Sequence, residues 1–473
     1  MRYSTGLSPR SKGSSYARAM RPAGRLHVCV LILAALAATA APAAVSGQDA
    51  AELKSRLTPV GAEREGNADG TIPAWTGGVT AAPGYVQGAP RPDPFPADKP
   101  LFSITARNVR DYEDKLPEGA KALFAKYPDY VMRIYPSRRS AAAPDWVYEN
   151  IFRNATRAHA APEGIAYGVE GAVGGIPFPI PRNGFEAMWN HLLAFWGTAR
   201  ELSVSTYVVP SGGAVEKAST YREIADFPYY YPGAAPDSFG AYYFKTLHLA
   251  VAPPARVGEG YLNWQPINIR RGNFTAWRLV PGEHRVRKAP GISYDVPDID
   301  SAGFVSLDEY YNFFGGLDHY DFKLIGKKEM YVPYNNNRLY TRPVSEVLGR
   351  AHANPDDLRY ELHRVWVVDG TLAPGQHDIV THRRLYLDED SWMAVYSDSW
   401  DEAGRLWKFG QATMYLMADV PAIIVGSQFV YDLQLGGYAY GFAFNDEASA
   451  YKVTAPHPAT LFTPDSLSAR SVR

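Results

Sequence analysis

Residues 358–416 carry the most regular hydrophobic pattern in the chain. Leu358, Tyr360 and Leu362 share one parity, while charged residues occupy the positions between them. A period of two is typical of a β-strand that lies between two different environments. Short turns rich in Gly, Pro and Asp divide the stretch. We therefore predict four consecutive antiparallel strands, at 358–369, 377–388, 391–401 and 405–416.

Both faces of this predicted meander carry apolar residues. In its third strand Trp392, Tyr396 and Trp400 hold one parity, and Met393 and Val395 hold the other. A sheet that is apolar on both faces needs a cover on one side, and a second cover or a ligand on the other. Few helices are predicted, so we expect the uncovered face to form an elongated groove, lined by Trp and Tyr, with Arg or His near one end.

The rest of the chain is also predicted to be mainly β. The stretch 184–196, capped by Asn183, has one apolar stripe and is expected to lie on a sheet face, burying Trp189 and Leu192. Further strands are predicted at 130–135, 146–158, 201–209, 215–224, 242–252, 260–269 and 276–280, and helices near 105–116, 117–127 and 345–349. The fold class is thus mainly β (α+β), a large antiparallel sheet of ten to twelve strands covered by a few helices.

The N-terminal residues have the pattern of a secretory signal peptide. Six basic residues precede an apolar run, Leu26–Ala40, which is followed by small residues up to Gly47. We predict that residues 1–47 are removed, with the mature N-terminus between 42 and 50, and that the protein is periplasmic. An N-terminal anchor that stays uncleaved is the alternative.

Composition excludes several classes of chemistry. Cys29 is the only cysteine and lies within the predicted signal peptide, so disulfides, thiolate metal sites and cysteine catalysis are not expected in the mature chain. Removing six of the 48 basic residues leaves 42 against 49 acidic residues, which argues against nucleic acid as a partner. No cofactor and no metal are expected.

Three segments are predicted to follow residue 47. Residues 48–103 are rich in Pro and Gly and are expected to wrap over the surface in extended form. Residues 104–460 are expected to form a single β domain, and 461–473 a C-terminal tail.

Three segments together are similar to a known family. They are 66–78 (GNADGTIPAWTGG), 174–191 (beginning GGIPFPIP and ending MWNH) and 386–392 (YLDEDSW). They resemble the exported bacterial family called domain of unknown function 1329. Trp277, the Pro281-Gly282 turn and the basic run 285–288 resemble a strand–turn–strand element of the outer-membrane lipoprotein-sorting proteins, the LolA/LolB-like group.

The resemblance implies a fold and a function. The fold would be a curved antiparallel sheet, a half-pipe closed by helices, whose concave face holds acyl chains. The partners would be a lipid or another hydrophobic small molecule, a proton-driven lipid exporter of the inner membrane and an outer-membrane protein. The mature chain lacks the lipoprotein cysteine of the LolB-like proteins, which leaves a soluble shuttle as the closer analogue.

Seven residues are candidates for ligand binding. The aromatic ones are expected to line the groove, and the two arginines to meet an anionic head group at its rim: Trp277, Trp366, Trp392, Trp407, Tyr415, Arg285 and Arg287. Core packing explains most aromatic residues of a large sheet equally well, and a solvated strand face explains the arginines.

Two acidic motifs could be mistaken for sites. Asp298, Asp300 and Glu309 fall at positions 1, 3 and 12 of a calcium loop, but position 5 is Ala302 and no helix precedes the loop. We expect instead that acidic residues cap the following segment, Leu307–Phe314. The run Asp388–Asp390 is expected to be a turn exposed to water.

The leading hypothesis is a non-enzymatic periplasmic carrier of a lipid or long-chain hydrophobic molecule. The chain contains none of the motifs HExxH, GxSxG, GxxxxGK[ST] or GxGxxG. Two alternatives stay open: a hydrolase acting on hydrophobic esters or glycans, and a carbohydrate-binding module. A hydrolase would place two carboxylates with shifted pKa values opposite each other in a pocket.

Overall fold

The computed structural model describes residues 45–280, 285–289, 294–447 and 451–470. Residues 1–44 of the predicted signal peptide and the Pro281-Gly282 turn lie outside these residues. No helix in the described part of the chain is long and apolar enough to cross a bilayer.

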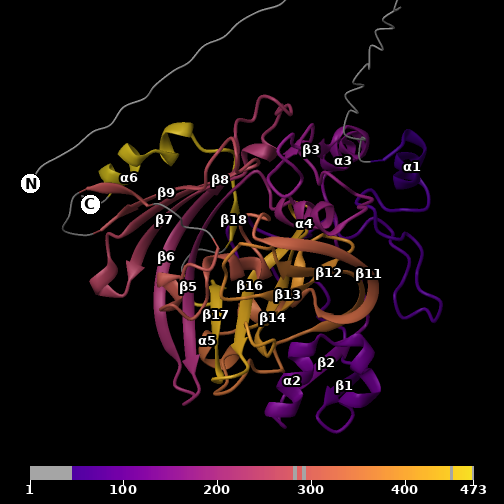
Figure 1. Cartoon of the computed structure of the whole chain (residues 1–473). Helices are drawn as coiled ribbons and strands as arrows, with labels where there is room; N and C mark the ends of the chain where they lie inside the picture. Colours follow the sequence, from indigo (N-terminus) through magenta and orange to yellow (C-terminus); the bar gives the residue numbers. More distant parts are fainter. Residues whose placement is uncertain (1–44, 281–284, 290–293, 448–450, 471–473) are drawn as a thin grey trace, which may run out of the picture. The chain divides into compact units, whose positions relative to one another are not determined.

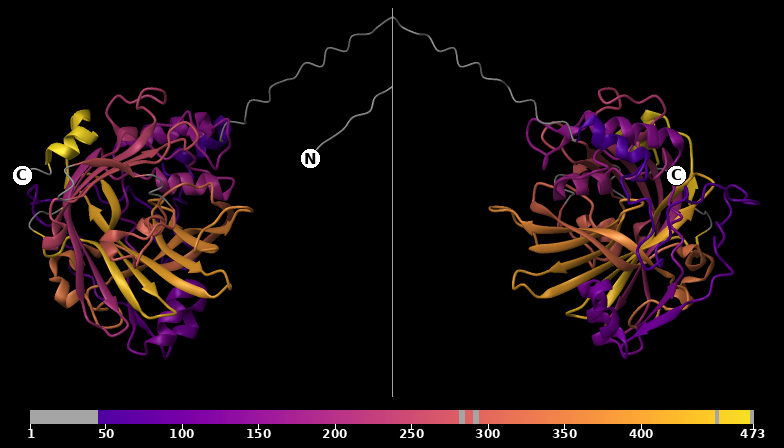
Figure 2. Two further views of the ribbon diagram at one scale, coloured as in Figure 1. Left: turned by 60° about the vertical axis from the view of Figure 1, so that its left-hand side comes forward. Right: turned by 90° about the vertical axis from the view of Figure 1, so that its right-hand side faces the viewer.

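Sixteen of the strands in the described residues form one sheet, in the order β1-β2-β12-β13-β14-β15-β16-β17-β5-β6-β7-β8-β9-β10, with β11 paired to β12 and β18 to β5. Its long strands are bent, so that the sheet curves round an inner face (Figures 1 and 2). The strands are β1 Phe102–Thr105, β2 Val131–Tyr135, β3 His159–Ala160, β4 Val169–Glu170, β5 Ala199–Pro210, β6 Glu216–Asp226, β7 Tyr242–Ala252, β8 Gly260–Pro266, β9 Thr275–Leu279, β10 Val286–Ala289, β11 Tyr320–Pro333, β12 Tyr360–Leu372, β13 His382–Asp388, β14 Ala394–Trp400, β15 Leu406–Met417, β16 Ala422–Asp432, β17 Gly437–Ala443 and β18 Lys452–Val453.

Short helices accompany the sheet. They are α1 Gly47–Ala51, α2 Glu118–Lys126, α3 Asp145–Arg157, α4 Gly184–Leu192, α5 Val344–Val347 and α6 Pro464–Arg470. As predicted, α4 lies on the sheet, against β11 and β12, and buries Trp189 and Leu192. Its His191 donates from Nε2 to Phe313 O (2.9 Å) and accepts at Nδ1 from Ala394 N (3.2 Å). Burial lowers the pKa of His191 to about 4, so the ring is neutral in this role.

The predicted meander is confirmed. β12, β13, β14 and β15 are consecutive antiparallel neighbours. The fold class is also confirmed, with sixteen strands in the sheet instead of ten to twelve. One pair, β2 with β12, is parallel.

One predicted strand is a helix, and several strands were not predicted. Residues 146–158 form α3, because Val147, Ile151 and Ala155 recur every four residues on its buried side, and Asp145 and Arg157 match the helix dipole. The longest of the unpredicted strands are β11, β16 and β17. β11 was hidden by the bulge between Leu324 and Gly326, which shifts its alternation by one residue.

Both faces of the meander are covered by the protein itself. On one face Asp398 accepts hydrogen bonds from Glu118 N (2.9 Å) and Gly119 N (2.8 Å) at the start of α2. On the other face Asn312, at the end of the 3₁₀-helix η6 (Leu307–Asn312), lies against Gly410 and donates to Ala394 O (2.7 Å). The groove predicted on this meander is therefore wrong: side chains of the chain fill the space.

The other half of the sheet, β6 to β10, is covered on its outer face by the C-terminal residues. Phe462 and Leu467 pack on the apolar parity of these strands, which includes Leu247, Leu262 and Leu279. The segment expected to be a tail thus forms part of the fold as far as the described residues extend. The inner face of the same strands carries the opposite parity.

Hydrogen bonds of a partly buried histidine, His457, attach this C-terminal segment to the sheet. His457 contacts Asp226 Oδ1 through Nδ1 (2.6 Å) and Glu201 Oε1 through Nε2 (3.1 Å). Burial opposes the charge of His457, but these two hydrogen bonds outweigh it and raise its pKa.

The His457 contact predicts a pH-dependent attachment. Because the folded-state pKa is raised, the contribution is complete below the unfolded value of about 6.5 and is lost as pH rises through the folded value. Limited proteolysis followed by mass spectrometry should show residues 454–470 cleaved faster at pH 9 than at pH 6. In His457→Ala cleavage should be fast at both pH values, whereas the exposed-site control His377→Ala should behave as the wild type. Equal rates at both pH values in the wild type would contradict the assignment.

The N-terminal segment from 55 to 101 runs mainly as turns and extended backbone over the sheet. Two buried contacts attach it. Arg91 donates from Nε and Nη2 to the two carboxylate oxygens of Asp419 (2.6 and 2.8 Å), and Trp392 Nε1 donates to Val60 O (2.9 Å).

Candidate functional site

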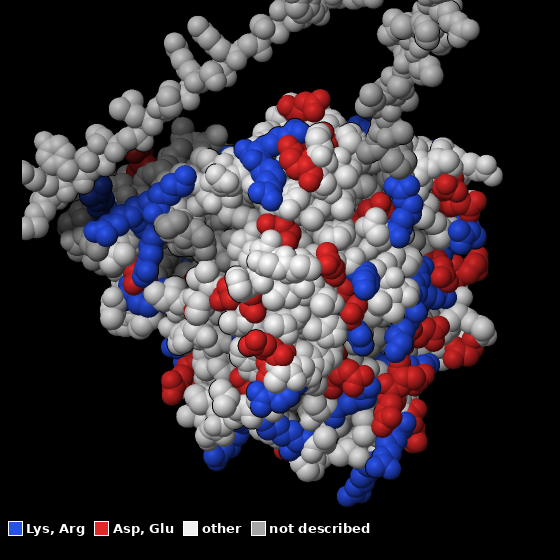
Figure 3. All heavy atoms as spheres, viewed as in Figure 1, with Lys and Arg blue, Asp and Glu red and all other residues white. Residues whose placement is uncertain are grey.

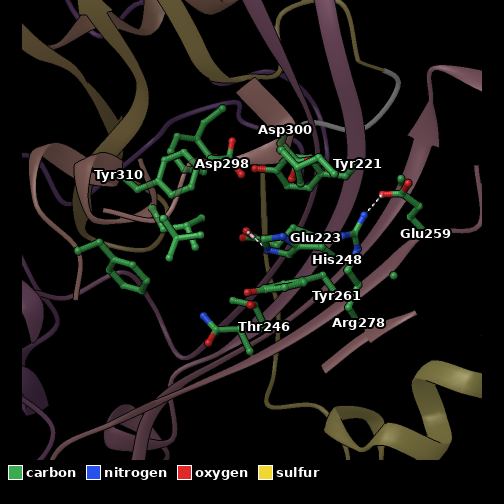
Figure 4. A pocket seen from close by; sticks show the side chains of 18 of the residues that line it. Tyr221, Glu223, Thr246, His248, Glu259, Tyr261, Arg278, Asp298, Asp300 and Tyr310 are labelled. Atoms are coloured by element: carbon green, nitrogen blue, oxygen red, sulfur yellow. Dashed lines mark hydrogen bonds and ion pairs between the residues drawn. The ribbon is translucent and has the colours of Figure 1, made fainter. Parts of the chain in front are cut away.

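A cavity of about 240 Å³ lies between the inner face of β6–β9 and the segment 296–315 (Figure 4). Phe462 and Leu467 cover the outer face of these strands, so the cavity lies on the inner side of the sheet. It is lined by Tyr221, Glu223, Phe244, Thr246, His248, Ala250, Arg256, Glu259, Gly260, Tyr261, Asn263, Gln265, Arg278, Val296, Pro297, Asp298, Ile299, Asp300, Leu307, Tyr310, Tyr311, Phe314, Gly315 and Phe442.

Strand register builds the sheet wall of this cavity. Glu223 of β6 pairs with His248 of β7, His248 with Tyr261 of β8, and Tyr261 with Arg278 of β9. Directly paired residues of antiparallel strands point to the same face. The four side chains therefore form one row across the cavity wall, as Figure 4 shows.

Glu223 is a buried carboxylate whose two oxygens are both bonded. Arg200 Nε donates to Oε1 (2.7 Å), and His248 Nε2 contacts Oε2 (3.0 Å). Burial disfavours the charge, but the guanidinium of Arg200 and the hydrogen bond to His248 outweigh burial and lower the pKa of Glu223 to about 2. Arg200 also donates to the hydroxyls of Tyr311 (2.9 Å) and Tyr451 (3.2 Å).

A second carboxylate has the opposite shift. Asp298 is buried, and desolvation together with repulsion from Asp300 raises its pKa to about 6. Its Oδ2 accepts a hydrogen bond from Ser301 N (2.8 Å). Asp300 accepts from Arg256 Nη2 (2.7 Å), which also contacts Glu259 (3.2 Å). The cavity thus holds four carboxylates and two arginines among its lining residues.

The wall that faces β6–β9 contains a cluster of aromatic residues, two of which have an unusual backbone conformation. Tyr311 and Phe442 have φ angles of 54° and 60°, a region that costs a non-glycine residue energy. Their rings stack with centroids 4.7 Å apart. Phe314 packs edge-on against Tyr311 (5.8 Å) and Phe244 (5.7 Å). The aromatic contacts hold this wall in place and keep the cavity open.

Two polar atoms on the sheet wall have no hydrogen-bond partner. They are the hydroxyl of Tyr261 and Oε1 of Gln265, whose side chain is 3% exposed. Gln265 uses its amide nitrogen to contact Asn263 Oδ1 (3.3 Å). A buried polar atom without a hydrogen-bond partner costs about 1–3 kcal/mol. A bound molecule could remove this cost by hydrogen bonding to the Tyr261 hydroxyl and by donating to Gln265 Oε1.

None of the seven predicted ligand residues lines this cavity. Trp392 and Tyr415 are fully buried core residues, and Trp366 stacks on Trp392 with centroids 6.0 Å apart. Trp277 lies on the outer face against Trp264. Trp407 donates from Nε1 to Asp432 Oδ2 (3.0 Å) beside a separate surface hollow.

The two predicted arginines lie near the cavity edge, on β10 and just before it. Arg287 pairs with Arg278, a lining residue, and therefore extends the row across the sheet. Arg285 is exposed. A role for either arginine in binding a head group stays a prediction.

The run Asp388–Asp390 is buried, so the expectation of a turn exposed to water is wrong. Asp390 accepts from Arg139 Nε (2.9 Å) and Nη2 (2.7 Å). Glu389 accepts from Lys327 (2.9 Å). Segment 55–101 and β11 cover the turn, and cations from distant parts of the chain pair with its carboxylates.

His363, Asp388 and Asp390 are also the group in the described residues whose geometry could place three ligand atoms around a metal ion. His363 already uses Nδ1 toward Asp388 (3.1 Å) and Nε2 toward Glu361 (3.4 Å). Asp390 is held by Arg139. Because each donor atom is engaged in an ion pair, the arrangement is that of a buried charge network.

The three acidic residues that resemble a calcium loop take part in separate interactions. Asp298 caps the 3₁₀-helix η5 (Ile299–Ser301), and Asp300 pairs with Arg256. Glu309 accepts from Ser306 N (2.7 Å) and from Lys408 Nζ (2.6 Å). The expected capping of the segment that starts at Leu307 is confirmed for Glu309, which forms a capping box with Ser306, whereas Asp298 caps the separate helix η5.

The alternation of polar and apolar residues in the sequence could have indicated the cavity residues of β6–β8. Polar and aromatic residues fill one parity of each strand, for example Thr246 and His248, while leucines fill the other, for example Leu247 and Leu249. Alternation of this kind predicts a sheet with one face on a core and the other on a polar space. The number of strands and their order are needed before these positions can be placed side by side.

Comparison with known proteins agrees with the resemblance of the three sequence segments. The model of a family described as protein of unknown function (DUF1329) matches residues 103–468. The chain belongs to this family. An uncharacterized protein of Pseudomonas aeruginosa is 38% identical over 459 residues, which is 95% of this chain and 98% of that protein.

Two solved structures are similar at lower levels. A DUF1329 family protein from Desulfovibrio piger has a TM-score of 0.40 and 14% identity, covering 57% of this chain and 92% of that one. A LolA superfamily protein from Nitrosomonas europaea has a TM-score of 0.33 and 11% identity, covering 58% and 94%.

Proposed function

We propose that this DUF1329 protein is a carrier that binds a hydrophobic small molecule in the cavity between β6–β9 and segment 296–315. The observation that supports the proposal is the unfilled cavity itself, on a sheet whose other half is packed on both faces. Its volume of about 240 Å³ exceeds the roughly 150 Å³ of an apolar cavity that takes up benzene. The cavity can therefore hold one chain or a small ring system.

Apolar contact would supply the binding energy. A buried methylene contributes about 0.8 kcal/mol, so a ligand with several carbon atoms against Leu307, Phe314 and Phe442 gains affinity mainly from leaving water. Association costs reduce this gain. Reversible binding by sequestration is what a carrier requires.

Fluorescence of the uncharged probe N-phenylnaphthylamine tests the proposal. Ala250 is a half-buried lining residue of β7, and Ala250→Trp should push an indole ring into the cavity and weaken probe binding at least tenfold. Val251, the next residue, is exposed and points to the opposite face, so Val251→Trp is the matched control and should bind like the wild type. Absence of binding to the wild type, or unchanged binding to Ala250→Trp, would refute the proposal.

A hydrolase is less well supported. Glu223 and Asp298 lie on opposite walls with pKa values moved apart, as an acid–base pair requires. Both oxygens of Glu223, however, are held by Arg200 and His248, and Asp298 caps a helix. These carboxylates are engaged in positioning their own walls, which favours the carrier.

Location and partners follow as further parts of the proposal. The N-terminal sequence supports export to the periplasm. Figure 3 shows acidic and basic side chains interspersed over one face, a surface that fits a small-molecule partner better than nucleic acid. A donor or acceptor in the inner or outer membrane, such as a lipid exporter, stays a prediction from the family resemblance.

A further inference from the structure

The two walls of the cavity differ in chemistry. The sheet wall carries hydrogen-bonding side chains on three neighbouring strands, beside the apolar Phe244 and Ala250: Glu223, Thr246, His248, Tyr261, Asn263 and Gln265. The facing wall presents the carboxylates of Asp298 and Asp300, and its other side chains are mostly apolar: Val296, Pro297, Ile299, Leu307, Phe314 and Phe442. A fatty acid, polar at one end and apolar along its chain, could not satisfy both the Tyr261 hydroxyl and Gln265 Oε1, the two sheet-wall atoms without a hydrogen-bond partner.

We propose that the ligand is an uncharged amphiphile with hydroxyl groups along one long side and a hydrocarbon surface on the other. This inference rests on the carrier function proposed above and specifies its ligand class. A flat, polyhydroxylated ring system has this form. Its hydroxyl edge would face β7 and β8, and its hydrocarbon face would contact segment 296–315.

Unpaired atoms on β8 support hydroxyl groups at more than one point. Tyr261 and Gln265 are four residues apart, so their Cα atoms are separated by about 13 Å along the strand. The Tyr261 hydroxyl can donate, and Gln265 Oε1 can only accept. Both are buried without a partner. A hydroxyl group both donates and accepts, so two hydroxyls at separate positions would satisfy both atoms.

The charges of the cavity argue against an anionic group inside it. Glu223 and Asp298 face the interior from opposite walls (Figure 4). The lining arginines are already paired, Arg256 with Asp300 (2.7 Å) and Arg278 with Glu259 (3.6 Å). An entering carboxylate or phosphate would be repelled, and it would have to break one of these pairs.

Competition for the N-phenylnaphthylamine site tests the ligand class. Methyl cholate, an uncharged ring system with hydroxyls on one face, should displace the probe at a concentration at least tenfold lower than methyl cholanate, which lacks the hydroxyls. Dodecanoate, a head-and-tail anion, should also compete at least tenfold less well. Equal or better competition by methyl cholanate or dodecanoate, while Ala250→Trp still blocks the probe, would overturn this inference and leave the carrier function standing. A wild type that does not bind the probe would overturn both.

Two isosteric variants locate the effect. Gln265→Leu and Tyr261→Phe combined should weaken competition by methyl cholate about tenfold, the value of two lost hydrogen bonds, and leave methyl cholanate unchanged. Gln87→Leu, at an exposed glutamine of the N-terminal segment, is the control and should change neither. Equal losses for both competitors would show that the polar row does not read hydroxyl groups, and would overturn the inference. Unchanged circular dichroism and unfolding midpoint verify that the variants are folded.

Discussion

Replacing His363 with leucine is expected to lower the free energy of unfolding by about 3–5 kcal/mol at pH 7, measured by urea denaturation. His363 lies between Asp388 and Glu361, and all three side chains are buried. Burial opposes its charge, but the hydrogen bonds and charges of the two carboxylates outweigh burial and raise the pKa of His363 to about 10. Leucine removes the cation that the two carboxylates share.

The pH dependence separates this explanation from simple loss of packing. A group whose folded-state pKa is raised stabilises fully below its unfolded value of about 6.5, and the contribution disappears as pH rises toward 10. The difference in stability between wild type and His363→Leu should therefore narrow from pH 7 to pH 10. His377→Leu, at an exposed histidine, should change the free energy by less than about 0.5 kcal/mol. A constant difference across this pH range would contradict the charge network.

Replacing Arg200 with methionine is expected to cost about 3–5 kcal/mol at pH 8, because it leaves the Glu223 carboxylate buried without its main cation. Arg200 and Glu223 are each no more than 3% exposed. The hydroxyls of Tyr311 and Tyr451 also lose their donor. Since Tyr311 stacks in the aromatic wall, binding of N-phenylnaphthylamine should weaken as well.

Two matched variants check the Arg200 prediction. Arg222→Met removes an arginine from the next strand, β6, whose side chain is 53% exposed and whose ion pair with Glu201 is 3.3 Å long. It should cost less than about 1 kcal/mol. Arg200→Met combined with Glu223→Gln should recover part of the lost stability, because no buried charge remains. Failure of the double variant to recover would show that packing of the arginine stem, and not charge, decides the cost.

The meander could be predicted from the sequence because its evidence is local. Alternation within each strand and short turns between strands identify β12 to β15 and their antiparallel order. The same kind of local evidence gives a wrong prediction at 146–158. Its mixture of polar and apolar residues suggests a strand, although Val147, Ile151 and Ala155 recur at helical spacing. Period-four spacing and the preceding proline would have corrected the assignment.

The site could not be predicted from the sequence, because it depends on the order of the strands in the sheet and on which segments cover them. Trp392 satisfies every criterion for a groove residue in the sequence, but the N-terminal segment accepts its indole hydrogen bond through Val60 and closes over it. The carboxylates at 388–390 were assigned to solvent for the same reason: Arg139, over 240 residues earlier, is what makes their burial possible. Neither fact can be read from spacing along the chain.

The pairing of β17 with β5 joins residues more than 200 positions apart at the middle of the sheet. The two halves of the sheet cannot be joined until residues 437–443 have arrived, and until then β5 presents an open edge. Such long-range closure makes folding slow and exposes strands to wrong pairing. The most vulnerable state of this chain is accordingly the interval before β17 pairs with β5.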